Sequence, residues 1–372
     1  MIESMDELKK IYVEPTNRCN LACVTCIRHA WDEPLGDMPW PVYEVLIEGL
    51  GGFSGGATIA FAGLGEPLIH AKFPEMVRLA HERGFRTEVT SNAMLLTPSL
   101  AASLVEAGLD QFVVSIDGAS ESAHGNVRPK ASLDEILAHV RTLNRLSEKR
   151  SGAMPRIGIE FVAMKRNIHE LPAFRKIAHR IRASFILITN VLPYTTALRG
   201  EILYRLGATS YEGGGTPYNP LWILPHMDWD RNTQGLLADI LRRRAKLSLL
   251  EIDVNQRKNH CPFVMAGSMA VAWHGGVSPC PALLHSYSCF IRDREKHIRR
   301  CEFGKLPELD LRTIWTNAEY TAFRERVRRF DFPPCTDCGG CDWAERNEAD
   351  CYGNPFPVCG DCLWARGILR CA

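Results

Sequence analysis

Short apolar segments recur along the first half of the chain, and longer segments with helical periodicity separate them. Most of these segments consist of apolar or β-branched residues, as is typical of buried strands in a parallel sheet. The pattern predicts six strands, at residues 11–14, 57–62, 86–90, 112–116, 157–163 and 185–189.

The segments between these strands carry helical signals. Apolar residues at positions 73, 76, 77 and 80 recur at helical spacing. Ser132 with Glu135 has the spacing of a capping box, and Asn167 with Glu170 repeats it before another helical pattern. Alternating strands and helices imply a parallel sheet, and six units are too few for a closed eight-unit barrel. We therefore expect an α/β fold, a partial, open (β/α)6 barrel of the TIM type.

The distribution of cysteines predicts the domain organisation. A chain of 372 residues is longer than one core normally needs, so two domains are expected. Of its 14 cysteines, three precede residue 30, none lies between residues 27 and 260, and the others lie from Cys261 to Cys371. We predict a barrel over residues 8–192, a bridging or inserted region over 193–258, and a small cysteine-rich α+β domain over 259–372.

Charge and hydropathy argue against several classes of protein. Lys and Arg (44) nearly balance Asp and Glu (43), and a net charge of +1 gives no basic surface for nucleic acid or an anionic membrane. No apolar stretch reaches the roughly 20 residues of a membrane span, and the acidic start lacks the apolar core of a secretory signal. We expect a cytoplasmic protein whose cysteines bind metal, because cytosolic thiols are kept reduced.

Three cysteines follow the first predicted strand. Cys19, Cys23 and Cys26 have C-x3-C-x2-C spacing. Three thiolates hold three irons of a four-iron four-sulfur cluster and leave the fourth iron open for a reacting ligand. Zinc usually takes four ligands, commonly from paired C-x2-C knuckles, whereas this loop offers one pair and an odd third cysteine. A zinc site or three buried free thiols is the alternative interpretation.

This loop resembles the signature of the radical S-adenosylmethionine (SAM) superfamily. The resemblance implies an enzyme in which SAM chelates the open iron and is cleaved by one electron to a 5'-deoxyadenosyl radical. Many members place an aromatic residue before the third cysteine, where this chain has Thr25. The fold that the resemblance implies is the six-unit barrel expected above.

Polar residues follow the predicted strands, at the edge where ligands of such sheets bind. The Gly-Leu-Gly-Glu-Pro turn at 63–67 resembles the superfamily's Gly-Gly-Glu-Pro motif, short polar side chains end the third and fourth strands, and a lysine follows the fifth. The resemblance implies that six of these residues bind SAM: Gly65, Glu66, Asn92, Ser115, Asp117 and Lys165. Helix capping or a simple turn is the alternative interpretation of such residues.

The C-terminal cysteines form a larger set. An alternating apolar run from Met269 to Cys280, broken by His-Gly-Gly, predicts a β-hairpin. The set resembles the SPASM extension of radical SAM enzymes, which carries one or two auxiliary four-iron four-sulfur clusters. Cys289 and Cys301 each lie alone in a charged or irregular segment, so we expect neither to be a ligand. A pair of zinc ribbons is the alternative. The candidate ligands are Cys261, Cys280, Cys335, Cys338, Cys341, Cys351, Cys359, Cys362 and Cys371.

Three segments, at 23–28, 189–194 and 341–368, make the chain similar to the radical SAM maturases that modify the cofactor of tungsten-containing aldehyde ferredoxin oxidoreductases. The similarity implies a partner oxidoreductase or its pterin cofactor as the target, with a reductant such as ferredoxin or flavodoxin. One alternative is a maturase of the thioether-forming or sulfatase-activating type that modifies a precursor peptide. Another is a non-catalytic iron-sulfur electron carrier or a zinc-binding module. The sequence identifies no catalytic acid or base.

Overall fold

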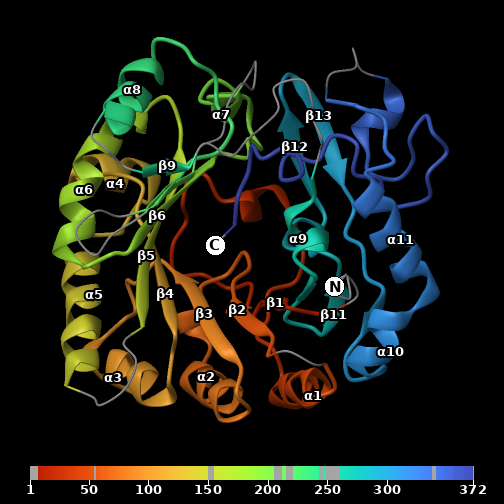
Figure 1. Cartoon of the computed structure of the whole chain (residues 1–372), viewed down its shortest axis with the longest axis horizontal. Helices are drawn as coiled ribbons and strands as arrows, with labels where there is room; N and C mark the ends of the chain where they lie inside the picture. The colour runs from red at the N-terminus through yellow and green to blue at the C-terminus, as the bar shows by residue number, and fades with distance from the viewer. Residues whose placement is uncertain are drawn as a thin grey trace.

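The fold is that of a computed structural model, which describes residues 7–53, 56–149, 155–204, 212–214, 221–242, 246–248, 260–336 and 341–371. Figure 1 shows a curved sheet with helices along its outer side and the C-terminal part beside it. Among these residues, none of the helices combines the length and the apolar character needed to cross a bilayer.

The six predicted strands are present and pair in parallel in chain order. Their observed ends lie within one residue of the predicted ends. The predicted α/β partial barrel is therefore confirmed. The strands are β1 (Lys10–Val13), β2 (Thr58–Phe61), β3 (Arg86–Ser91), β4 (Gln111–Ser115), β5 (Arg156–Ala163) and β6 (Phe185–Asn190).

Helices cover the outer face of these strands (Figure 1). Phe61 of β2 packs against Tyr43 and Phe73, with ring centroids 6.2 and 5.2 Å apart, and each such buried ring contributes about 2 kcal/mol to stability. Ser132 accepts a hydrogen bond from the Glu135 N–H (3.3 Å), as the first predicted capping box requires. The helices are α1 (Trp40–Leu50), α2 (Phe73–Glu82), α3 (Pro98–Ala107), α4 (Glu121–Val127), α5 (Leu133–Glu148) and α6 (Leu171–Arg180).

The second predicted capping box, Asn167 with Glu170, is wrong. The side chain of Asn167 caps no helix, because its Oδ1 accepts from the Met164 N–H (2.8 Å) and its Nδ2 donates to the Val162 carbonyl (2.9 Å). Glu170 accepts from the Ala119 N–H (2.9 Å) instead of reaching back to Asn167. Both side chains therefore hydrogen-bond to backbone groups near the ends of β4 and β5.

The inner face of the barrel is polar. Successive side chains of a strand point to opposite faces of the sheet. The neighbours of the outward-facing apolar residues therefore point into the barrel. Lys10 of β1 donates to Glu88 of β3 (2.8 Å), and its ammonium lies 5.0 Å from the centroid of the Tyr12 ring. The interior therefore offers charged and hydrogen-bonding groups.

Both edges of the sheet continue beyond the six strands. The predicted hairpin is confirmed as β10 and β11, and β10 pairs in parallel with β1, so the cysteine-rich part shares its sheet with the barrel. At the other edge, β8 pairs in parallel with β6. The added strands are β7 (Glu212–Gly214), β8 (Leu221–Ile223), β9 (Lys246–Ser248), β10 (Ser268–Val271), β11 (Gly276–Ser278) and β14 (Gly304–Lys305).

The rest of the C-terminal part packs beside this edge. Strands β12 (Tyr287–Ile291) and β13 (Arg294–Ile298) form a separate antiparallel pair. Apolar periodicity predicts a helix over 233–247, which is confirmed over Gln234–Arg242 as α8 and is wrong at its end, where Lys246–Ser248 forms strand β9. The further helices are α7 (Thr196–Arg199), α8 (Gln234–Arg242), α9 (Pro262–Met265), α10 (Leu311–Thr316) and α11 (Ala318–Arg329).

Candidate functional site

The three cysteines of the first loop lie together beyond the end of β1. The Cys26 N–H donates to the Cys23 carbonyl (3.1 Å), and the Leu21 N–H donates to Cys19 Sγ (3.5 Å). Burial raises the pKa of Cys19 and of Cys23, and the neighbouring Cys26 thiol adds to both shifts. Three neighbouring thiols fit a four-iron cluster whose fourth iron is open to SAM.

A largely buried arginine lies next to this loop. Arg128 Nη1 donates to Cys23 Sγ (3.7 Å), and its Nε donates to Asp117 Oδ2 (2.7 Å). Burial alone would lower the pKa of Arg128, but Asp117 and Cys23 raise this pKa above its ordinary value. Asp117 is fully buried and also accepts from the Val162 N–H (2.8 Å). The pair holds a fixed positive charge beside the cysteines.

Sequence reasoning missed Arg128. The sequence predicts Lys165 as the cation for SAM, but Lys165 is exposed and its Nζ donates to the Gly200 carbonyl (2.7 Å). The structure does not bring Lys165 to the cysteine loop. No motif or periodicity separates Arg128 from an ordinary surface arginine, so only the fold identifies it.

The Gly-Leu-Gly-Glu-Pro turn after β2 packs against the cysteine loop. The Glu66 N–H donates to the Arg18 carbonyl (2.8 Å), and a Cβ on Gly65 would stand 2.0 Å from the Thr16 carbonyl oxygen. Glycine is required at position 65 because the two backbones approach so closely. This approach is to protein backbone, and contact of Gly65 with SAM stays a prediction.

The Glu66 carboxylate joins the ends of β2 and β3. Its Oε1 accepts from Ser91 Oγ (2.7 Å) and the Leu68 N–H (3.1 Å), and its Oε2 accepts from the Asn92 N–H (2.8 Å). Burial raises the pKa of Glu66, while these hydrogen bonds act in the opposite direction. The observed role of Glu66 is to position Asn92, and its contact with SAM stays a prediction.

Asn92 and Ser115 lie at neighbouring strand ends. Asn92 Nδ2 donates to Asn20 Oδ1 (2.9 Å) and lies 3.9 Å from Cys19 Sγ. Ser115 ends β4 and is buried. The structure therefore gathers Asn92 and Asp117 at the cysteine loop, with Ser115 at the adjoining strand end.

A carboxylate that sequence reasoning also missed lies inside the barrel. Burial raises the pKa of Glu160 to about 7. The charge of Arg128 acts to lower this pKa, and the charge of Asp117 acts to raise it. The signal that could have found Glu160 is a single acidic residue in the mostly apolar strand β5. A carboxyl group that titrates near neutral pH is suited to exchange a proton with a substrate.

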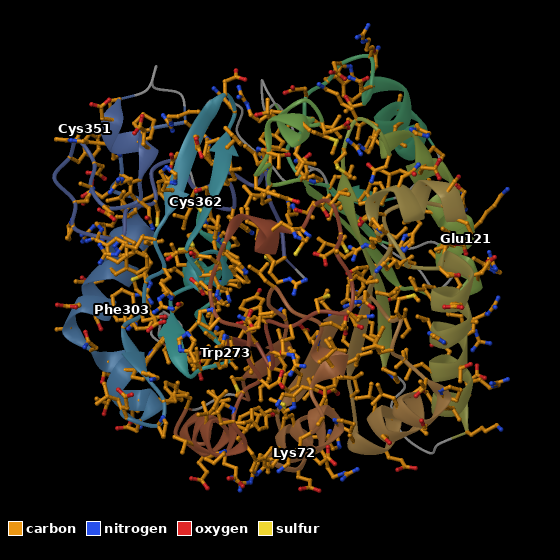
Figure 2. The ribbon with its side chains drawn as sticks, turned by 180° about the vertical axis from the view of Figure 1, so that it is seen from behind. Lys72, Glu121, Trp273, Phe303, Cys351 and Cys362 are labelled. Atoms are coloured by element: carbon orange, nitrogen blue, oxygen red, sulfur yellow. The ribbon has the colours of Figure 1, made fainter. Side chains whose placement is uncertain are left out.

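Four C-terminal cysteines form one group, here named the four-thiol group. Burial raises the pKa of Cys280, and the thiols that add to this shift are those of Cys261, Cys362 and Cys359. The Cys362 N–H donates to the Cys359 carbonyl (3.1 Å), so these two share one turn. Figure 2 shows Cys362 beside the strand pair β12 and β13, toward the barrel. Four neighbouring thiols fit the ligands of one auxiliary cluster.

A second set of cysteines lines a cavity in the C-terminal part. Cys335, Cys341 and Cys351 border this small cavity, together with Lys296 and Asp361. Lys296 Nζ donates to both carboxylate oxygens of Asp361 (2.7 and 2.8 Å). Figure 2 shows Cys351 at the outer edge of this part. These three thiols suit a second auxiliary cluster that takes a fourth ligand from elsewhere.

The other cysteines fall outside these groups. Cys338 lies outside the described residues, and Cys371 accepts a hydrogen bond from Trp364 Nε1 (3.3 Å). Cys289 and Cys301 are buried, and burial raises the pKa of both to about 12. Within the described ranges, no three His, Cys, Asp or Glu side chains are placed to bind one metal ion. The assignment of ligands to each cluster stays a prediction.

A buried histidine joins the barrel to the C-terminal part. His285 Nε2 lies 3.0 Å from both carboxylate oxygens of Glu14, and its Nδ1 lies 2.6 Å from Glu33 Oε2. Burial alone would lower the pKa of His285, but the two carboxylates raise this pKa to about 9. The imidazolium therefore donates to both at neutral pH. This network links the end of β1, the segment after the cysteine loop and the C-terminal part.

Two family profiles match the sequence. Residues 13–158 match the radical SAM superfamily, and residues 261–342 match SPASM, an iron-sulfur cluster-binding domain. The first match spans the cysteine loop and β2 to β4, and the second spans the hairpin and Cys335, so both agree with the site described here.

Two curated relatives match over nearly the whole chain. The tungsten-containing aldehyde ferredoxin oxidoreductase cofactor-modifying protein of Pyrococcus furiosus is 32% identical, over 98% of this chain and 97% of that protein. The AdoMet-dependent heme synthase of Methanosarcina barkeri is 29% identical, over 98% of this chain and 96% of that protein.

Solved structures share the fold. Streptococcus suis SuiB bound to S-adenosylmethionine has a TM-score of 0.59 at 15% identity, and the match covers 93% of this chain and 73% of SuiB. Native anSMEcpe with bound AdoMet has a TM-score of 0.53 at 18% identity, and the match covers 90% of this chain and 88% of anSMEcpe. At these identities the similarity concerns the fold.

Proposed function

The chain is a member of the radical SAM superfamily with a SPASM domain, and from this premise we propose that it modifies the cofactor of a tungsten-containing aldehyde ferredoxin oxidoreductase. It is an enzyme that uses SAM and four-iron four-sulfur clusters. The observation that carries the proposal is the relative named for this function, which aligns over 98% of the chain at 32% identity. The similarity includes both the barrel and the cysteine-rich part.

The cysteine loop and its neighbours bind the reactive group. When bound, the cluster and SAM together supply a 5'-deoxyadenosyl radical, which removes a hydrogen atom from a substrate. Cys19, Cys23 and Cys26 hold this cluster. Arg128, which Asp117 fixes in place at 2.7 Å, offers its guanidinium to the SAM carboxylate.

The strand-end residues orient SAM. Asn92 presents an amide beside Cys19, and Ser115 presents a hydroxyl at the end of β4. These groups donate and accept hydrogen bonds, as the carboxylate, ammonium and ribose groups of SAM require. Gly65 and Glu66 support this arrangement by fastening the turn after β2 to the cysteine loop.

The interior of the barrel suits a polar substrate. Lys10 and Glu88 form an ion pair there, and Glu160 lies near Arg128. A pterin cofactor carries ring N–H, carbonyl and phosphate groups that hydrogen-bond to such residues. The four-thiol group and the cysteines around the cavity hold auxiliary clusters, and a protein such as ferredoxin or flavodoxin supplies electrons.

The proposal is tested on the cofactor of the partner enzyme. A tungsten-containing aldehyde ferredoxin oxidoreductase is produced in cells that contain this chain, its Cys23→Ala variant or neither, and the mass of the extracted pterin cofactor is measured. We expect one mass with the intact chain and another, shared mass in the other two cases. The Cys301→Ala variant serves as the control and should behave as the intact chain.

Two results would contradict the proposal. The first is a cofactor of the same mass in all these cells. The second is a mass change on a precursor peptide in place of the cofactor, which would favour the peptide-modifying hypothesis.

A further inference from the structure

A buried histidine of the C-terminal part lies between two carboxylates of the barrel. His285 is 1% exposed, and its Nε2 faces Glu14 at 3.0 Å while its Nδ1 faces Glu33 at 2.6 Å. An ionised carboxylate only accepts hydrogen bonds, so both ring nitrogens carry hydrogen and the ring is an imidazolium. The Trp31 ring packs against it, with ring centroids 4.1 Å apart. One cation therefore binds two segments of the barrel.

Glu14 extends this contact to the turn after β2. The Leu64 N–H donates to Glu14 Oε1 (3.1 Å), and a Cβ on Gly63 would stand 2.6 Å from Glu14 Cγ. The Trp273 N–H donates to Glu14 Oε2 (3.4 Å) from the hairpin of β10 and β11. Figure 2 shows Trp273 where this hairpin meets the barrel. The fully buried Glu14 carboxylate thus joins the turn, the hairpin and His285.

Glu33 extends the contact to the segment that follows the cysteine loop. This segment, residues 31–37, runs beside the residues that precede the loop. The Asn17 N–H donates to the Gly36 carbonyl (3.3 Å), and the Gly36 N–H donates to Asn17 Oδ1 (2.8 Å). His285 therefore holds the cysteine loop through the chain on both of its sides.

We propose that His285 is a positioning residue for SAM. Through Glu14 and Glu33 it holds the turn after β2 and the cysteine loop in the arrangement that binds SAM. The C-terminal part thus contributes to SAM binding through this ring, in addition to carrying cysteines. The inference rests on the SAM-binding roles proposed above for the loop and the turn, and it does not depend on the identity of the substrate.

The physical reason is the cost of a buried charge without a partner. Without His285, the Glu14 carboxylate keeps no cation beside it, so it must take up a proton or move. Either change alters the group that accepts from the Leu64 N–H. Arg300 also acts on Glu33, but its side chain is 46% exposed, so water and salt screen its charge. Arg300 therefore does not replace the buried ring.

The test measures the binding of SAM itself. The full chain and its His285→Gln variant are reconstituted anaerobically and reduced, and SAM is titrated while the electron paramagnetic resonance signal of the clusters is followed. His285→Gln should raise the Kd and the KM for SAM by at least about tenfold, because loss of a hydrogen bond to a charged group has an effect of this size. The kcat at saturating SAM and the iron content should stay unchanged. The matched control is His297→Gln, which removes an exposed histidine of the same part and should bind SAM as the wild type does.

Two further variants test whether His285 acts through its carboxylate partners. Glu14→Gln should raise the Kd for SAM as His285→Gln does, and the double variant should bind SAM no worse than either single variant, since both changes break one contact. Glu33→Gln alters only the other contact of the ring and should raise the Kd to a smaller extent. It keeps the inference testable if the His285 variant does not fold.

The results that would overturn the inference are specific. They are a Kd for SAM that stays unchanged in His285→Gln or, where that variant does not fold, in Glu33→Gln, and effects of His285→Gln and Glu14→Gln that multiply in the double variant. A loss of iron and of kcat with an unchanged Kd would show a role in stability alone and would also overturn it. A partner cofactor that is not modified would contradict the proposed function and leave this inference intact.

Discussion

At the scale of the residue, Arg128 places a fixed positive charge beside Cys23 of the cysteine loop. Its Nε is bound to Asp117, so one edge of the guanidinium is held while the rest stays available near Cys23. A lysine has a single point charge and cannot keep both contacts.

Arg128→Lys should therefore weaken SAM binding. Loss of one charge-assisted hydrogen bond costs about 1.5 to 3 kcal/mol, which corresponds to a rise of at least about tenfold in the KM for SAM. Steady-state formation of 5'-deoxyadenosine measures this KM, and iron content serves as the check on folding. Lys165→Ala should leave the KM unchanged. A KM that responds to Lys165 and not to Arg128 would refute the assignment of the cation.

His285 makes stability depend on pH. Its pKa is raised to about 9 in the folded protein, so its contribution is complete below the unfolded pKa and is lost as the pH rises through 9. The difference from the ordinary value near 6.5 corresponds to about 3 kcal/mol. Unfolding of the wild type and of His285→Gln should differ most near pH 6 and converge above about pH 9. A gap that stays constant over this range would show that the network carries no proton-linked stability.

The sequence could predict some of these residues and not others. Cys19, Cys23 and Cys26 are identified by their spacing, which is local. Arg128 reaches the cysteine loop, and Glu160 lies near Arg128, only because the strands are ordered as they are, and no local pattern encodes these contacts.

At the scale of the element, the turn after β2 and the cysteine loop act as one unit because Gly65 allows their backbones to touch. A Cβ there would stand 2.0 Å from the Thr16 carbonyl oxygen, so one of the two loops must move. Such a shift displaces the Glu66 carboxylate, and with it the Asn92 backbone that it holds.

Gly65→Ala should therefore lower the rate of 5'-deoxyadenosine formation severely, by about tenfold or more, because displacements near 1 Å in a catalytic site have large effects. Gly235→Ala is the matched control, since a Cβ at Gly235 in α8 meets open space. The rates of both variants are compared at equal iron content. Equal rates would mean that the close approach at Gly65 is not needed.

The elements themselves are largely predictable from sequence. Six strands lie within one residue of their predicted ends because buried parallel strands are short, apolar and β-branched. The capping box at Asn167 fails because the amide of that residue hydrogen-bonds the backbone of Met164 and Val162, which lie a few residues earlier in the chain, and so caps no helix.

At the scale of the whole molecule, the cysteine-rich part extends the barrel sheet. Strand β10 pairs with β1 in parallel, with Ile11 opposite Met269. The hairpin itself follows from its alternating pattern, but its pairing joins residues far apart in sequence, and no local signal predicts that register. This shared sheet fixes the four-thiol group relative to the cysteine loop.

The central claim is that the chain cleaves SAM at a cluster held by Cys19, Cys23 and Cys26. The most direct measurement compares iron content and 5'-deoxyadenosine in the reconstituted, dithionite-reduced wild type and its Cys23→Ala variant. The account predicts about twelve irons per chain and SAM cleavage in the wild type, and about eight irons without cleavage in the variant. Zinc in place of iron, or full cleavage by Cys23→Ala, would contradict it.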